Sequence, residues 1–283
     1  MSNVPIKIFN IASTHVNREE VRHWLNHIGA EGYEIPADGA VSDPALIVAL
    51  AGRRCYMSFE PGLNPNVTRV RTDMVDYIDN ILKVGHGSVT EHAVYSFSIE
   101  GVSRVFTGEM NRHRAGWAIS EGSMRFIRFN KDIPWWLPTS LTDSPEDDAD
   151  LLERKKRSRE VFERAFKHQS ECYAELLDIW DMVEGDHNFT YKKKVTSCLR
   201  RIVGMGVATG GVWTGNLRAI RHVITMRADA AAEEEIYYVF SNILAMMMKK
   251  EPYFFSDFTQ ITEENYEKGG PGIGAWVPKY RKV

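Results

Sequence analysis

Between positions 109 and 128 the chain gathers side chains suited to binding anions. Four arginines and a histidine fall within seventeen positions, with two glutamates and a serine beside them: Arg112, His113, Arg114, Arg125, Arg128, Glu109, Glu121 and Ser123. A guanidinium group is a planar fork of donors that matches phosphate or carboxylate oxygens two at a time. The combination favours a site for a polyanionic small molecule. A solvated basic face is the simpler alternative, and we would favour it for the Arg-His-Arg triplet alone.

A second group of such side chains lies about a hundred positions further on, in Gly215–Arg227. If this segment is helical, Arg218 and His222 share one side at ~100° per residue, and Arg227 projects to the other side. One helix serving one ligand could not use all three side chains. The helix therefore either passes between two ligands or belongs to a site shared between subunits. An amphipathic interface helix with surface arginines is the alternative.

The two segments resemble motifs of the flavin-dependent thymidylate synthases. In that family Arg-His-Arg is followed by Ser, one further residue, Arg and an aromatic residue, as here in residues 123–126. The eight residues between Arg114 and Ser123 are one more than usual, and of the family's Ser-x-Asn-Glu run only Glu121 is kept. Residues 216–227 match the family's Asn-x-Arg-x-x-x-His-x-x-x-x-Arg pattern without gaps.

The resemblance implies a role for each of these residues. Arg227 would be catalytic, because its guanidinium would stabilise an ionised uracil ring at nitrogen 3 and the adjoining carbonyl. The uridine nucleotide would be held by Glu109, Arg112, Glu121, Ser123, Arg125, Arg200 and Arg227. The flavin would be held by Ser88, Arg112, His113, Arg114, Glu121, Asn216, Arg218 and His222.

Two further segments supply residues to these sets. Gly85–His92 is similar to the family's Gly-His-x-Ser/Thr-x-x-Glu-His run, which places Ser88 at the flavin. A loop that caps the following element is the alternative. Arg200 fits the family's Ala-Arg-x-x-Leu-Pro segment by its distance from the second motif. Gly204 stands in place of the proline there, and Arg201 is a rival for the same role.

Methylation of carbon 5 of uracil requires an electron-rich ring. An enzyme can attach a nucleophile at carbon 6 or can stabilise negative charge on the ring. The three cysteines, Cys55, Cys172 and Cys198, form no CxxC pair, and none adjoins the arginine-rich stretch. The resemblance implies FAD, NADPH and 5,10-methylenetetrahydrofolate as cofactors, in a site without the dinucleotide-binding GxGxxG motif. The substrate is open between dUMP, giving dTMP, and UMP, giving 5-methyl-UMP.

Two other classes of function compete with this one. A non-catalytic nucleotide- or RNA-binding oligomeric protein would use the arginine cluster electrostatically. The formal net charge of −3 and the paucity of lysine in the motifs argue against it and against general nucleic-acid binding. A mostly helical oligomeric scaffold would tolerate Arg227→Ala without functional loss. His86 and His92 are six positions apart, which is not a usual spacing for metal ligands, so we expect no metal site.

Composition and periodicity bound the fold. There is no run of eighteen apolar residues and no secretory h-region, and the cysteines are expected to be reduced, so we expect a cytoplasmic protein without a membrane span. We expect one α+β domain over residues 1–283, with a central, mostly antiparallel sheet flanked by long helices. The family resemblance implies a homotetramer with sites at subunit junctions.

Hydrophobic periodicity predicts the individual elements. A strand over 124–129 would place Arg125 on the face opposite Arg128. The glycine-rich tail 269–274 is expected to be a loop. Strands are predicted for 4–14, 94–100 and 124–129, and helices for 18–28, 45–55, 70–84, 102–110, 153–182, 191–203 and 229–249.

Overall fold

The computed structural model describes residues 3–129, 132–262 and 274–283. The glycine-rich tail expected as a loop lies outside the described residues except for Gly274, which forms a turn. Among the described residues, no helix combines the length and the apolar character needed to cross a bilayer.

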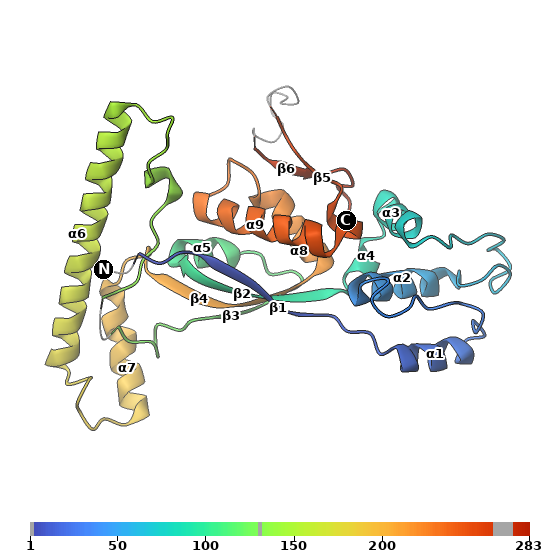
Figure 1. Cartoon of the computed structure of the whole chain (residues 1–283). Coiled ribbons are helices and arrows are strands. Elements are labelled where there is room, and N and C mark those ends of the chain that lie inside the picture. Colours follow the sequence, from blue (N-terminus) through green and yellow to red (C-terminus); the bar gives the residue numbers. More distant parts are fainter. Residues whose placement is uncertain (1–2, 130–131, 263–273) are drawn as a thin grey trace.

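A four-stranded antiparallel sheet forms the centre of the molecule, with the strands in the order β1-β2-β4-β3 (Figure 1). Tyr95, Phe97 and Ile99 on β2 and Trp213 on β4 are each at most 1% exposed and line one face of this sheet. The mostly antiparallel sheet expected from the sequence is confirmed. The strands are β1 Lys7–Ser13, β2 Val94–Ser103, β3 Trp117–Glu121 and β4 Ala208–Asn216.

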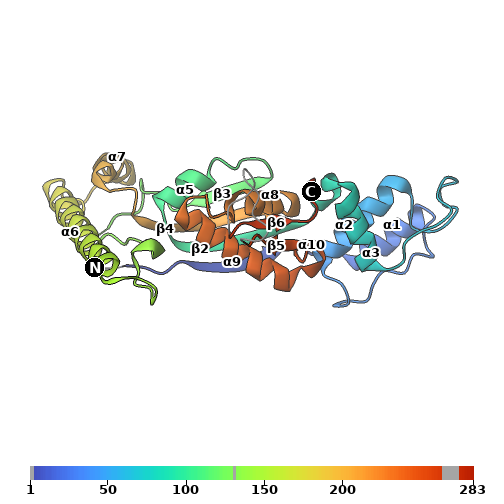
Figure 2. The same cartoon turned by 90° about the horizontal axis from the view of Figure 1, so that it is seen from above.

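Three helices cover the apolar face of the sheet (Figures 1 and 2). They are α5 Arg104–Met110, α8 Leu217–Arg227 and α9 Glu234–Lys250. Asn216 caps α8, because its side-chain oxygen accepts from the backbone N–H of Ala219 at 2.8 Å. The chain therefore passes directly from β4 into the helix that carries the second motif.

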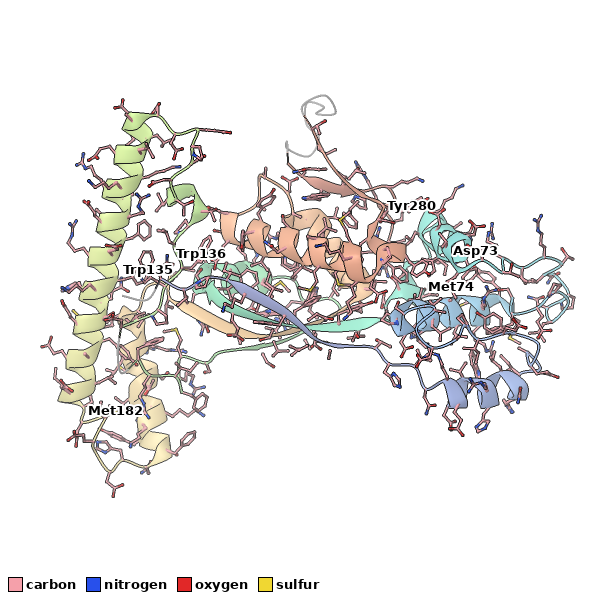
Figure 3. All side chains as sticks on the ribbon, in the orientation of Figure 1. Asp73, Met74, Trp135, Trp136, Met182 and Tyr280 are labelled. Carbon is pink, nitrogen blue, oxygen red and sulfur yellow. The ribbon has the colours of Figure 1, made fainter. Side chains whose placement is uncertain are left out.

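Two groups of helices lie beyond the two ends of the sheet. At one end lie α1 Arg18–His27, α2 Asp43–Tyr56, α3 Met74–Val84 and α4 Gly87–Thr90, and at the other α6 Ala149–Ile179 and α7 Phe189–Leu199 (Figure 2). Trp135, labelled in Figure 3, bridges Val207 next to β4. Its ring also stacks on Phe166 of α6, with the ring centroids 5.0 Å apart. The remaining elements are short: η1 Thr139–Leu141, η2 Arg200–Ile202, α10 Pro252–Phe255, β5 Phe258–Gln260 and β6 Trp276–Pro278.

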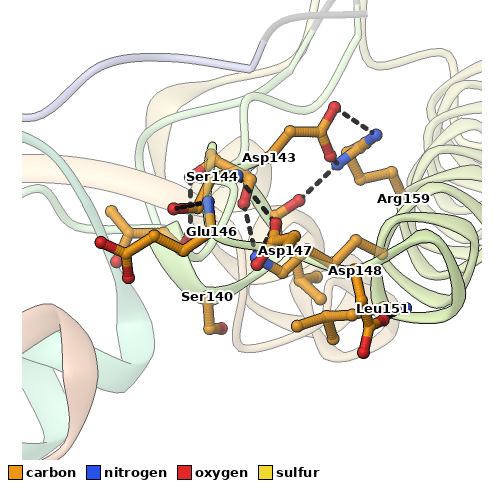
Figure 4. Close-up of polar contacts among 12 residues, drawn as sticks. Ser140, Asp143, Ser144, Glu146, Asp147, Asp148, Leu151 and Arg159 are labelled. Atoms are coloured by element: carbon orange, nitrogen blue, oxygen red, sulfur yellow. Dashed lines mark hydrogen bonds and ion pairs between the residues drawn. The ribbon is translucent and has the colours of Figure 1, made fainter.

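An acidic run, residues 146–148, leads into the start of α6. Asp148 caps it by accepting from the backbone N–H of Leu151 at 2.8 Å. Asp147 pairs with Lys155 at 2.6 Å, and Asp143 pairs with Arg159 (Figure 4). The helix consequently begins at Ala149, four residues before the predicted start.

The strand predicted for residues 124–129 is wrong. The backbone N–H groups of Phe126 and Ile127 both donate to the carbonyl of Ser123, so the chain turns there. The sheet ends earlier, where Gly122 N donates to the carbonyl of Gly210 at 2.8 Å. As a result Arg125 and Arg128 line the same notch and do not lie on opposite faces.

Glu235 ties α9 to the start of α5 and is 1% exposed. Its carboxyl oxygens accept from the backbone N–H of Ser103 at 2.6 Å and from the Ser103 hydroxyl. Ser103 caps α5 in turn, because its hydroxyl oxygen accepts from the N–H groups of Val105 and Phe106. Burial raises the pKa of Glu235 to about 7, since the charged form loses its hydration.

We expect Glu235→Gln to flatten the dependence of stability on pH. Because this pKa is raised, the stabilisation is complete below pH 4.5 and is lost as pH rises through about 7. The interval corresponds to at most ~3 kcal/mol at ~1.4 kcal/mol per pH unit. Glutamine can still accept from the Ser103 N–H and donate to its hydroxyl. Urea midpoints at about pH 5 and about pH 8 measure this; equal pH slopes in variant and parent would contradict it.

Candidate functional site

The end of α5 and the end of α8 meet around Arg227. Its Nη1 lies 2.9 Å from Glu109 Oε2, and its Nε donates to His113 Nε2 at 2.8 Å. The Arg227 side chain is 19% exposed. Two residues of the arginine-rich stretch and the last residue of the second motif are therefore in direct contact, although more than a hundred positions separate them in the sequence.

His113 is neutral in this arrangement, because Nε2 accepts a hydrogen bond and the ring proton lies on Nδ1. Burial, followed by the charges of Arg227 and His222, lowers the pKa of His113 below its ordinary value. Arg112 acts in the same direction, whereas Glu109 opposes the shift. These five side chains, which we call the Arg227 cluster, present positive charge around an uncharged imidazole.

A separate hollow of about 780 Å³ lies between β3, the 123–124 turn and η2. Ser123, Arg200 and Arg201 all line it, so Arg200 and its rival Arg201 reach the same space. Glu121 also lines it and pairs with Arg104 at 2.7 Å. The complete lining, which we call the Ser123 hollow, is Arg104, Ile119, Ser120, Glu121, Ser123, Met124, Arg200, Arg201 and Val203.

Arg218 marks a third polar region, on the side of α8 away from Arg227. Its Nη1 pairs with Glu91 Oε1 at 2.7 Å. A Cβ atom on Gly87 would lie 2.8 Å from Arg218 Nε, so the guanidinium packs closely against Gly87. Ser88 and His222 are exposed. The structure confirms that Arg218 and Arg227 point to different sides of α8.

The remaining sequence-predicted residues divide between two places. Arg114 lines a hollow of about 370 Å³ on β3, together with Trp117 and Glu121. Arg125 lines a small notch against α7 and is not among the residues of the Ser123 hollow. Within one chain, therefore, Ser123, Arg125 and Arg227 do not share one space. The described residues include no group of three or more His, Cys, Asp or Glu side chains that could hold a metal ion.

Comparison with known proteins identifies the family. The profile of the family described as "Thymidylate synthase complementing protein" matches residues 39–253. The flavin-dependent thymidylate synthase of Corynebacterium diphtheriae is 31% identical over 229 residues, covering 80% of this chain and 84% of the relative. That of Mycolicibacterium gilvum is 32% identical over 256 residues, covering 90% of each. The chain belongs to the flavin-dependent thymidylate synthase family.

Membership of the flavin-dependent thymidylate synthase family makes the chain an enzyme, so the non-catalytic alternative is wrong. The fold agrees with solved structures of the same kind. Thymidylate synthase X of Helicobacter pylori, solved with FAD and dUMP, gives a TM-score of 0.55 at 18% identity, covering 89% of this chain and 98% of that one. The UMP/dUMP methylase PolB of Streptomyces cacaoi, solved with 5-Br dUMP, gives a TM-score of 0.59 at 18% identity, covering 90% of this chain and 94% of that one. The α+β fold class predicted from the sequence is confirmed.

The sequence did not mark Arg104 as a residue of the candidate site. Its Nη1 holds one oxygen of Glu121, and Asn111 donates to the other at 3.4 Å. Arg104 directly follows the Ser103 cap and lies outside both motifs, so no pattern in the sequence marked it. Its contact with Glu121 depends on the start of α5 meeting the end of β3, which only the fold reveals.

Proposed function

We propose that this protein methylates carbon 5 of a uridine monophosphate, with 5,10-methylenetetrahydrofolate as the one-carbon donor, FAD as the redox cofactor and NADPH as the reductant. The observation that carries the proposal is the fixed guanidinium of Arg227, held from both sides by Glu109 and His113. Family membership supports the reaction class. The relatives solved with dUMP, 5-Br dUMP and 5-Br UMP support a uridine nucleotide as substrate.

The proposed catalytic role of Arg227 is electrostatic. Its guanidinium stays charged at any working pH, so it neither donates nor accepts a proton. Placed against nitrogen 3 and the adjoining carbonyl of uracil, it would stabilise negative charge on the ring and make carbon 5 nucleophilic. Glu109 and His113 position the guanidinium, and the low exposure of Arg227 strengthens its field.

The nucleotide would be bound by side chains from two protomers. Ser123 and Arg200 in the Ser123 hollow, with Glu121 and Arg125 beside them, would hold its phosphate and ribose. In this proposal Glu109, Arg112 and Arg227 come from a neighbouring protomer, because one chain does not bring the two sets into one space. A closed homotetramer would repeat this junction by symmetry.

The residues of the third region fit a flavin. The Arg218 guanidinium lies close to Gly87, and the exposed Ser88 and His222 would add polar contacts. We propose that Ser88, Arg112, His113, Arg114, Glu121, Asn216, Arg218 and His222 hold the cofactor. When bound, the flavin would supply the hydride that completes the new methyl group.

Protonation of His113 at low pH should break its hydrogen bond with Arg227 and lower activity. The neutral ring persists until the pH falls below the ordinary pKa of histidine, ~6.5, because the pKa of His113 is lowered. A proton on Nε2 then removes the acceptor for Arg227 Nε. We expect His113→Gln to remove the acid limb of the kcat/KM profile, since the amide oxygen accepts at every pH. An unchanged acid limb would contradict this.

The proposal is tested by reconstitution. Purified protein should be yellow and should convert dUMP to dTMP or UMP to 5-methyl-UMP when FAD, NADPH and methylenetetrahydrofolate are all present. Omitting NADPH or methylenetetrahydrofolate should abolish product, as should removing the bound FAD. The ratio of kcat/KM for the two nucleotides identifies the preferred substrate. A colourless protein that yields no methylated nucleotide would refute the proposal.

A further inference from the structure

A basic notch lies beside the Ser123 hollow, where the turn after β3 meets α7. We call it the α7 notch; it has a volume of about 80 Å³ and is lined by Arg125, Phe126, Arg128, Phe189, Lys192, Lys193 and Thr196. Four of these seven residues are cations. They come from two segments more than sixty positions apart in the sequence, so the fold, and not a local charge run, brings them together.

The cations of the α7 notch lack carboxylate partners in the described part of the chain. The ion pairs found there include neither Arg125 nor Arg128, and neither Lys192 nor Lys193. The helix α7 contains three lysines and no acidic residue. The whole chain carries 38 acidic against 35 basic residues, so this excess of positive charge is local. Like charges gathered in one hollow repel one another unless an anion neutralises them.

Two aromatic rings line the α7 notch. Phe126 and Phe189 stack with their centroids 5.7 Å apart, yet they are 48% and 70% exposed. Lys193 Nζ lies 5.0 Å from the centre of the Phe126 ring. An exposed, stacked pair of rings beside unpaired cations suits a ligand with an aryl group followed by anionic groups.

The α7 notch continues from the proposed nucleotide site. Arg125 N donates to Ser123 Oγ at 3.4 Å, so the residue that enters the notch is tied to the residue that lines the hollow. Arg200 follows the last residue of α7 directly. A nucleoside monophosphate has one phosphate, and the proposed function assigns Ser123, Arg125 and Arg200 to the nucleotide. Arg128, Lys192 and Lys193 of the notch therefore remain for a second ligand bound next to the nucleotide.

We propose that the α7 notch binds the p-aminobenzoyl-γ-glutamyl portion of the folate that donates the one-carbon unit. This inference rests on the proposed function. The aryl ring of that portion would lie on Phe126 or Phe189, and the glutamyl carboxylates that follow it would pair with Lys192, Lys193 and Arg128. Each added γ-glutamyl unit brings one more carboxylate, so longer tails should bind more tightly.

Binding of p-aminobenzoyl-tri-γ-glutamate tests the notch without any turnover. Calorimetry on the flavin-loaded protein should show binding that weakens about tenfold in Lys192→Ala/Lys193→Ala, equivalent to ~1.4 kcal/mol. The matched control is Lys156→Ala/Lys249→Ala, which removes the same charge from exposed positions of α6 and α9. Equal affinity in the notch variant and the control would overturn the inference, as would tighter binding of a single-stranded oligonucleotide than of the tail.

Kinetics with two donors separates this inference from the proposed function. Wild-type enzyme should show a KM about tenfold lower for the triglutamyl than for the monoglutamyl donor. The Lys192→Ala/Lys193→Ala variant should lose most of that preference, because the triglutamyl donor, which has more carboxylates, should lose more affinity than the monoglutamyl donor. Turnover with equal KM values for both donors in the wild type would overturn the inference alone, as would a variant altered only in its KM for NADPH. Absence of turnover with either donor would refute the proposed function and leave the calorimetric result as the test of the notch.

Discussion

Replacing Arg227 with alanine should lower kcat by about a hundredfold to a thousandfold, the usual effect of removing one preorganised donor from a developing anion. The KM for the nucleotide should change far less, because the phosphate contacts in the Ser123 hollow remain. The Arg227 side chain is partly exposed and ends α8, so the fold should persist. Steady-state kinetics with circular dichroism and the flavin spectrum as controls measures the effect.

Arg227→Lys is the matched variant. Lysine keeps the positive charge but lacks the fork that contacts Glu109 and His113 at once. We expect activity between those of the wild type and the alanine variant. An alanine variant with unaltered kcat would show that Arg227 only joins α8 to α5.

Mixing two inactive variants should restore activity if the site is shared between protomers. Arg227→Ala lacks one half of the proposed site and Arg200→Ala lacks the other. In oligomers assembled at random from equal amounts, about half of the junctions have an intact Arg200, and about half of these also have an intact Arg227. About a quarter of the junctions are therefore complete, and about a quarter of wild-type activity is expected. Co-refolding of the two purified variants, with separate tags to confirm mixed assemblies, provides the measurement.

The controls for mixing are simple. Each variant refolded alone should stay inactive, and a chain with both substitutions should restore nothing when mixed with either single variant. Mixed assemblies without any recovered activity would mean that Arg200 and Arg227 serve a site within one chain, or serve different sites.

The sequence predicted the helices well because their apolar stripes and caps are local. The second motif was placed on a helix with Arg218 and Arg227 on different sides, and α8 has that geometry. It did not predict β3 or β4, because glycines interrupt the alternation of β4 and β3 is only five residues long. The strand expected at 124–129 shows the converse error: alternation of Arg125 and Phe126 with their neighbours mimicked a strand where the chain turns.

The candidate site was predictable in its residues but not in its grouping. The contact between Arg227 and His113 depends on α8 lying beside α5 across the sheet, which no local pattern encodes. The separation of Arg125 from the Ser123 hollow follows from the turn at Ser123. The sites assigned to nucleotide and flavin stay predictions, as do the single-domain boundary 1–283, the tetramer and the cytoplasmic location.

Release of the carbon 5 hydrogen tests electrostatic activation most directly. Cys198 is the cysteine to exclude, because it is exposed on α7 two positions before Arg200. With nucleotide tritiated at carbon 5, the variant Cys55→Ser/Cys172→Ser/Cys198→Ser should release tritium within about twofold of the wild-type rate, since no thiolate attacks the ring. Arg227→Ala, with all its cysteines, should release almost none. A cysteine-free enzyme that releases no tritium, beside an Arg227→Ala enzyme that releases it at full rate, would contradict activation by the guanidinium.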